Sequence, residues 1–249
     1  MKFCKYVLNV KQCTPNCMIY GELGRTPLYL TIRKRLISYW CSLVSSENRK
    51  LSICMYKLLY ELHTNDVYND KWLCFVKNEL YSNGFNNVWD YQFITSCKEF
   101  PILYEQRLKD TFIQKWYSDV QNSSKCNVYK EFKEFEFEDY LVKLPHFIVG
   151  YITKLRLSCS KLPIETGRYH NIDREFRFCN LYNQDIIGDE YHLIFECRNN
   201  SIVNLREKYL PVYYTNNAFR YKLIILLKNV KYRKIGVALG KFLKETQMF

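Results

Sequence analysis

The sequence predicts a mainly α-helical protein, organised as a helical bundle, a small irregular module and a basic helical tail. Gly and Pro are scarce, with 8 and 6 among 249 residues, which argues against a sandwich or barrel built on many tight turns. Apolar residues recur at three- and four-residue steps along most of the chain, as helices require. The 48% hydrophobic content, with 22 Tyr and 16 Phe, suffices for a large aromatic core.

Residues 1–157 hold the predicted bundle. The predicted helices cover residues 28–44, 51–62, 72–80, 102–120 and 146–157. Asp70 is expected to cap the third of these helices, and Gly84 to supply the left-handed residue after its end. The long fourth helix is expected to bury a stripe that contains Leu103, Leu108 and Trp116.

The composition of the sequence changes at Ser158. Residues 158–200 are polar and rich in turn formers, which predicts an irregular module that includes a short hairpin. Helical periodicity resumes near Ile202. Residues 201–249 are therefore predicted to form an amphipathic helical tail.

The positive charge is concentrated at the two ends of the chain. The net charge of +12 divides into +5 for residues 1–70, −2 for 71–197 and +9 for 198–249. Such a local excess fits contact with a polyanion, RNA or DNA, although a solvated helix face, an acidic protein or an anionic membrane surface could also account for it. The candidate nucleic-acid contacts are Arg33, Lys34, Arg35, Lys228, Lys231, Arg233, Lys234, Lys241 and Lys244.

The cysteines and the absence of long apolar runs indicate an intracellular protein, nuclear or cytoplasmic. The 11 cysteines are odd in number and mostly embedded in apolar sequence, as buried thiols in a reducing compartment are. No apolar leader follows Met1, and no run is long enough to span a bilayer. Membrane insertion is therefore not expected.

Three residues of the irregular module could share a metal ion, and zinc is the candidate. Zinc takes four N or S ligands, commonly one pair from a tight turn and one from a second element. His192 and Cys197 can form one pair, provided that a helix end or turn brings these i, i+5 positions together. Cys179 could begin the other pair, but Tyr182 stands where a second cysteine is needed, and a neutral phenol is a poor ligand.

Other side chains could complete the set, or no metal could bind. The candidate substitutes are His170, Asp185, Asp189 and Glu190. The alternative is that Cys179, His192 and Cys197 pack or form hydrogen bonds without metal.

The motif Ile187-Gly-Asp-Glu-Tyr-His-Leu-Ile-Phe-Glu-Cys197, together with the Arg177 to Tyr182 segment before it, resembles the zinc-knuckle-like segment near the C-terminus of LINE-type (non-LTR) retrotransposon reverse transcriptases. Further segments resemble the family's regions after the polymerase core and occur in the same order: 14–28, 33–40, 71–73, 164–168 and 241–243. The likeness thus spans about residues 13 to 245. In this resemblance, Tyr182 occupies the second position of a Cys-Cys-His-Cys ligand set.

The resemblance implies a nucleic-acid-binding fragment from beyond the polymerase core, with 1–157 as a thumb- or connector-like region and 158–200 as a degenerate zinc knuckle. No paired aspartates of a polymerase and no endonuclease motif are visible, so we expect no enzymatic activity. The alternative is a structural or protein-interaction product, a relic or a domesticated one, with no direct role at nucleic acid and with unknown protein partners.

Overall fold

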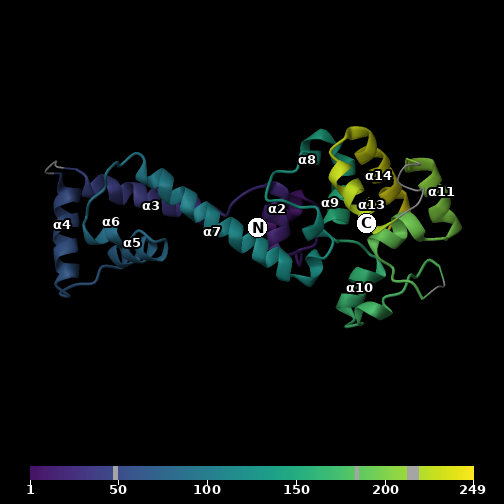
Figure 1. Cartoon of the computed structure of the whole chain (residues 1–249), viewed down its shortest axis with the longest axis horizontal. Helices are drawn as coiled ribbons and strands as arrows, with labels where there is room; N and C mark the ends of the chain where they lie inside the picture. Colours follow the sequence, from purple (N-terminus) through teal and green to yellow (C-terminus); the bar gives the residue numbers. More distant parts are fainter. Residues whose placement is uncertain (47–49, 183–184, 212–218) are drawn as a thin grey trace. The chain divides into compact units, whose positions relative to one another are not determined.

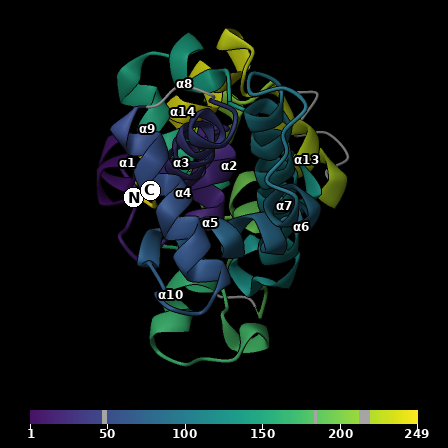
Figure 2. The same cartoon turned by 90° about the vertical axis from the view of Figure 1, so that its left-hand side faces the viewer.

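The fold is mainly α-helical, as predicted (Figures 1 and 2). The computed structural model describes residues 1–46, 50–182, 185–211 and 219–249. Within these ranges there is no β-strand, and the only extended pairing is an isolated antiparallel bridge between Phe178 and Ile187. No helix in the described ranges is long and apolar enough to cross a membrane.

The helices of the N-terminal part are α1 (Lys2–Val7), α2 (Asn16–Leu23), α3 (Leu28–Val44), α4 (Leu51–Thr64), α5 (Lys71–Ser82), α6 (Asn86–Asp90) and α7 (Phe100–Asn122). Those that follow are η1 (Ser124–Cys126), η2 (Tyr129–Glu131), α8 (Tyr140–Lys143), α9 (His146–Arg156), α10 (Pro163–Tyr169), η3 (Arg174–Phe176), η4 (His192–Glu196), α11 (Asn200–Tyr209), α13 (Arg220–Asn229) and α14 (Arg233–Thr246). The elements η1 to η3 are short 3₁₀ helices, whereas η4 is a π-helical turn.

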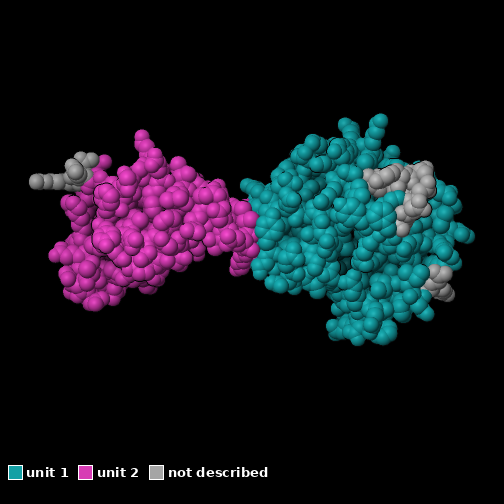
Figure 3. Space-filling view, in the orientation of Figure 1, with its two compact units in different colours: residues 1–25, 116–249 teal, residues 26–115 magenta. Residues whose placement is uncertain are grey.

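The chain forms two compact units, shown in Figure 3. Unit 1 comprises residues 1–25 and 116–249, and unit 2 comprises residues 26–115. This division differs from the three consecutive segments predicted from the sequence. The difference arises because α9, expected in the bundle, packs against α14, expected in a separate tail (Figures 1 and 2).

Close packing between α9 and α14 places the apolar face of α14, a helix expected in the separate tail, in the core of unit 1. A β-carbon on Gly240 would lie 2.4 Å from Cγ2 of Ile148, so the glycine lets the two helices approach closely. Leu239 and Phe242 are fully buried in the same core. The apolar face of the basic helix is therefore covered by unit 1, which leaves its basic face outward.

Unit 2 is a small helical bundle with its own aromatic core. The rings of Trp40 and Trp89 stack with centroids 6.0 Å apart, and the indole N–H of Trp40 donates to the hydroxyl of Tyr56 at 2.9 Å. The predicted cap of α5 is confirmed, because Asp70 accepts hydrogen bonds from the amides of Trp72 and Leu73 at 2.9 and 3.0 Å.

The predicted buried stripe of α7 is partly wrong. Leu103 is 58% exposed, whereas its neighbour Tyr104 is fully buried and donates a hydrogen bond to Glu79 at 2.8 Å. Leu108 and Trp116 are buried as expected. Tyrosine can take a core position here because its hydroxyl donates a hydrogen bond to a buried carboxylate. Hydrophobic periodicity does not reveal such a pairing.

Candidate metal centre

The irregular module of unit 1 builds a sulfur and nitrogen cluster from two short pieces of backbone. The first is the predicted hairpin, in which the amide of Cys179 donates to the carbonyl of Ile186 at 2.8 Å. The amide of Gly188 donates to the carbonyl of Arg177 at 2.9 Å. These two bonds fix the position of Cys179 in the hairpin.

Gly188 allows the hairpin to pack tightly against the start of α10. A β-carbon at this position would lie 2.8 Å from Cγ of Pro163 and 3.0 Å from Cα of Cys179. Backbone atoms cannot yield as a flexible side chain can, so a larger residue would displace the hairpin. The glycine thus contributes to where the Cys179 sulfur lies.

The second piece is the π-helical turn η4, which carries His192 and ends at Cys197. The amide of Cys197 donates to the carbonyl of His192 at 2.7 Å, an i to i+5 bond. In an α-helix, side chains five residues apart point in widely different directions. The wider π turn brings them to one side, and such turns are frequent at functional sites. The side chain of Asp189 caps the turn by accepting from the amide of His192 at 2.8 Å.

Two polar side chains of the following segment hold both pieces in place. The guanidinium of Arg206, on α11, donates to the carbonyls of Ile194 at 2.8 Å and Cys197 at 2.9 Å. The side-chain amide of Asn199 donates to the carbonyl of Leu181 at 2.9 Å. The turn after Cys179 and the turn before α11 are thereby tied together.

These contacts bring Cys179, His192 and Cys197 into one group that could hold a metal ion. Their ligand atoms all lie within 4.8 Å of one another. His192 is only 3% exposed, and neither of its ring nitrogens has a hydrogen-bond partner. The closest carboxylate oxygen recorded for Nδ1, from Glu196, is 3.9 Å away, too far for a hydrogen bond. A buried imidazole without hydrogen-bond partners is costly, and a metal ion would remove part of this cost by binding the nitrogen that carries the lone pair.

The electrostatic surroundings favour the protonation state that a metal needs at the histidine. Burial lowers the pKa of His192 below its usual value, so the ring is neutral at pH 7 and has a lone pair to donate. Burial raises the pKa of the Cys197 thiol, while the nearby Arg206 guanidinium acts in the opposite direction. Metal binding must therefore displace a proton from Cys197, and Arg206 stabilises the resulting thiolate.

None of the substitute ligands considered from the sequence joins this group. The cluster contains neither His170 nor Asp185, Asp189 or Glu190 among the described residues. Asp189 instead caps η4. Glu190 is buried separately, and desolvation raises the pKa of its carboxyl to about 7. Tyr182 is half-buried against the core of unit 1.

The basic residues predicted on α3 are largely used inside unit 2. Arg33 forms an ion pair with Glu79 at 3.4 Å, and Lys34 forms one with Glu105. Arg35 is exposed and takes part in no ion pair recorded among the described residues. These pairs connect α3 to α5 and α7, so two of the three side chains serve packing within the unit.

The basic residues near the C-terminus fall into two groups. Lys228 and Lys231 line a polar pocket of about 330 Å³ together with acidic side chains of the 134–139 segment, among them Glu134 and Asp139. The second group lies on α14 and consists of Arg233, Lys234, Lys241 and Lys244, all exposed. No ion pair among the described residues involves this second group.

Sequence reasoning missed the two residues that organise the cluster. Asn199 has a recognisable signal, because asparagine before a run of helix formers is a common N-cap, and it does accept from the amides of Ser201 and Ile202 at 3.1 and 3.4 Å. Arg206 has no such signal, since an arginine on a helix is usually a surface residue. Comparison with protein-family models, curated proteins and solved structures gives no match for this chain.

Proposed function

We propose that this chain is a non-catalytic nucleic-acid-binding protein whose irregular module is stabilised by zinc. The proposal takes up the resemblance of the 177–197 segment and the ordered pieces around it to the C-terminal region of LINE-type reverse transcriptases. RNA and DNA share the feature that would be recognised, a regular series of phosphate charges.

The observation that carries the proposal is the basic face of α14. Lys234, Lys241 and Lys244 are exposed and recur at seven- and three-residue steps, so they lie along one side of the helix. The opposite side, with Leu239 and Phe242, is buried in unit 1. A helix anchored through its apolar face presents a fixed row of cations, and such a row binds phosphates with little loss of conformational entropy.

Zinc suits the cluster of Cys179, His192 and Cys197 for a chemical reason. Two thiolates and an imidazole are borderline-soft donors, which zinc prefers and magnesium or calcium does not. When bound, zinc would supply cross-links between the hairpin, through Cys179, and the two ends of η4, through His192 and Cys197, rather than reaction chemistry. With only three protein ligands in the group, binding should be weaker than at a complete four-ligand structural site.

A second role is favoured by one observation, the arrangement of Lys228 and Lys231. These lysines line a pocket with acidic side chains of the same unit, so part of the C-terminal positive charge is balanced internally. If the basic side chains of α14 likewise face carboxylates, those carboxylates belong to an acidic protein partner. The chain is then a protein-interaction module rather than a nucleic-acid-binding protein.

Salt-dependent binding to generic RNA and DNA tests the proposal. The triple variant Lys234→Gln, Lys241→Gln, Lys244→Gln should bind at least about tenfold more weakly at low salt, because it loses three phosphate contacts. The slope of log affinity against log salt should become shallower by about 2 to 3. A matched triple variant of exposed lysines in unit 2, Lys57→Gln, Lys71→Gln, Lys98→Gln, should behave as the wild type.

Two results would contradict nucleic-acid binding. One is the absence of binding at low salt, and the other is an affinity that does not change with salt. If the α14 variant binds RNA and DNA like the wild type but loses an acidic polypeptide ligand, the interaction-module role is correct instead.

A further inference from the structure

A pocket of about 460 Å³ lies in unit 1, apart from the cysteine and histidine cluster. Its wall comes from three separate stretches of the chain: η2 and the residues before it, Arg174 of η3, and the first turns of α13. The volume falls in the range of small-molecule sites, roughly 300 to 1,000 Å³. The lining residues are Asn127, Val128, Lys130, Glu131, Arg174, Arg220, Tyr221, Leu223 and Ile224.

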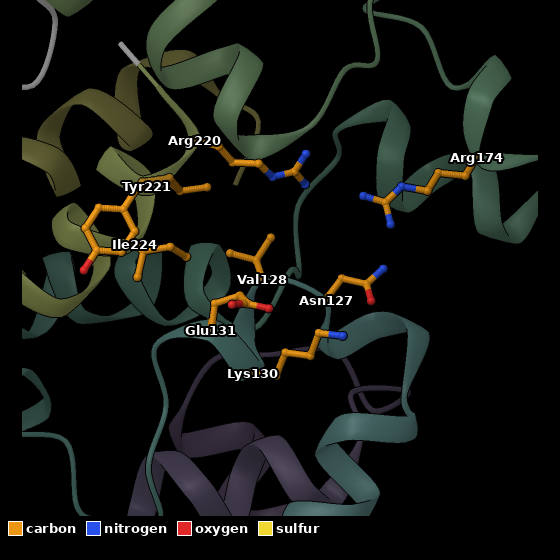
Figure 4. A pocket seen from close by; sticks show the side chains of 9 residues that line it. Asn127, Val128, Lys130, Glu131, Arg174, Arg220, Tyr221 and Ile224 are labelled. Carbon is orange, nitrogen blue, oxygen red and sulfur yellow. The ribbon is translucent and has the colours of Figure 1, made fainter. Parts of the chain in front are cut away.

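One side of the pocket is rich in hydrogen-bond donors. Figure 4 shows the Arg220 and Arg174 guanidinium groups, the Lys130 ammonium group and the Asn127 amide around the same space. Three cations face one carboxylate, that of Glu131. None of the ion pairs found in the described part of the chain involves Lys130, Arg174 or Arg220. Convergent cations that take part in none of these ion pairs suit an anion with several oxygens, and guanidinium forks match phosphate geometry.

The other side of the pocket is apolar and aromatic. In Figure 4 the Tyr221 ring and Ile224 lie across from the guanidinium groups. Tyr221 is 61% exposed and Phe219 is 51% exposed, and their rings are nearly parallel at 12° with centroids 6.3 Å apart. Exposed aromatic faces beside an arginine are the surfaces on which nucleobases stack.

We propose that this pocket binds one nucleotide unit, with its phosphate on Arg174, Arg220 and Lys130 and its base against Tyr221. The combination of a donor-rich side and an aromatic side distinguishes a nucleotide from an inorganic anion, which would use only the first, and from an apolar ligand, which would use only the second. The bound nucleotide is either free or the phosphorylated end of a strand. The inference goes beyond the proposed function, because it needs neither the α14 face nor zinc.

Calorimetric titration of the full chain with AMP, adenosine and inorganic phosphate tests the pocket. AMP should bind at least about tenfold more tightly than either part alone. The double variant Arg174→Gln, Arg220→Gln should weaken AMP binding at least tenfold. Tyr221→Ala should weaken AMP binding and leave phosphate binding unchanged. Arg107→Gln, an exposed arginine of unit 2, is the matched control and should bind AMP as the wild type does.

Competition with short oligonucleotides shows whether the ligand is a free nucleotide or a strand end. If a 5′-phosphorylated hexamer displaces AMP and the 5′-hydroxyl hexamer does not, the ligand is a strand end. If neither displaces it, the ligand is a free nucleotide. The inference is wrong if AMP binds no better than phosphate, or if the double variant binds AMP like the wild type. These results are separable from the proposed function, which depends on long RNA or DNA and on the α14 lysines.

Discussion

Glu22 and Arg156 lie 134 positions apart in the sequence and form a fully buried ion pair in unit 1. Two guanidinium nitrogens of Arg156 donate to both carboxylate oxygens of Glu22, at 3.1 to 3.3 Å. A third nitrogen donates to the carbonyl of Leu227 at 2.7 Å, and the hydroxyl of Tyr140 donates to Glu22 at 2.7 Å. The pair thus joins α2, α9, α8 and α13, and α14 packs against the last three of these helices.

Removing one member of this pair should destabilise the protein strongly. Arg156→Met leaves the Glu22 carboxylate buried without its cation, which costs about 3 to 5 kcal/mol. The double variant Glu22→Gln, Arg156→Met should lower the free energy of unfolding by less, because neither member of the pair is left as an unpaired charge. The exposed pair Asp139 and Lys143 is the control, and breaking it should cost less than about 1 kcal/mol. Urea unfolding measures these differences, and equal costs for the single and the double variant would disprove a net charge effect.

Tyr182→Cys should tighten zinc binding at least about tenfold, because it supplies the thiolate that the second ligand position lacks. The carbonyl of the preceding residue, Leu181, already accepts a hydrogen bond from Asn199, so the backbone next to the new cysteine is held in place. Equilibrium zinc titration measures the change. Tyr60→Cys, at a half-buried tyrosine of unit 2, should give no gain. If Tyr182→Cys gives none either, the zinc-knuckle interpretation of this segment is wrong.

Zinc affinity should rise with pH from about 6 to 9. Each of Cys179 and Cys197 must lose a proton to become a ligand, and burial raises the pKa of Cys197, so protons compete with zinc over this range. His192 should contribute less than the thiols, since burial lowers its pKa below the usual value. Zinc titrations at several pH values, with release of up to two protons per ion measured by a pH indicator, test this. An affinity that is flat with pH would exclude thiolate ligands.

The buried carboxyl of Glu190 should make stability fall as pH rises. Desolvation raises the pKa of this carboxyl from 4.5 to about 7 in the folded protein. Between these values the folded state holds a proton that the unfolded state has lost, so the free energy of unfolding decreases as pH rises and levels off above about 7.

Glu190→Gln removes this dependence. The variant should match the wild type near pH 4 and exceed its stability above pH 8 by at most roughly 3 kcal/mol. Glu175→Gln, at an exposed position, should show no such gain. Urea unfolding of the zinc-free protein at several pH values measures the difference, and a constant difference across the range would contradict the prediction.

The sequence by itself determined the helical class, most helix positions and the members of the cluster. The class follows from local spacing, because helices form from residues three and four positions apart. The Asp70 cap and the helix after Pro145 are likewise local features. The candidate ligands were also readable, since Cys and His are the side chains that zinc prefers. Nucleic-acid contact was inferred from charge alone and stays a prediction.

Only the tertiary structure decided which distant residues meet. It placed the basic C-terminal helix against α9 in the core of unit 1, where the sequence indicated a separate tail. It paired Glu22 with Arg156, buried Tyr104 in place of Leu103, and brought Arg206 onto the backbone that holds His192 and Cys197. The physical reason is that such contacts depend on packing and on hydrogen-bond partners far away in the chain, whereas periodicity reports only which face of a helix is apolar.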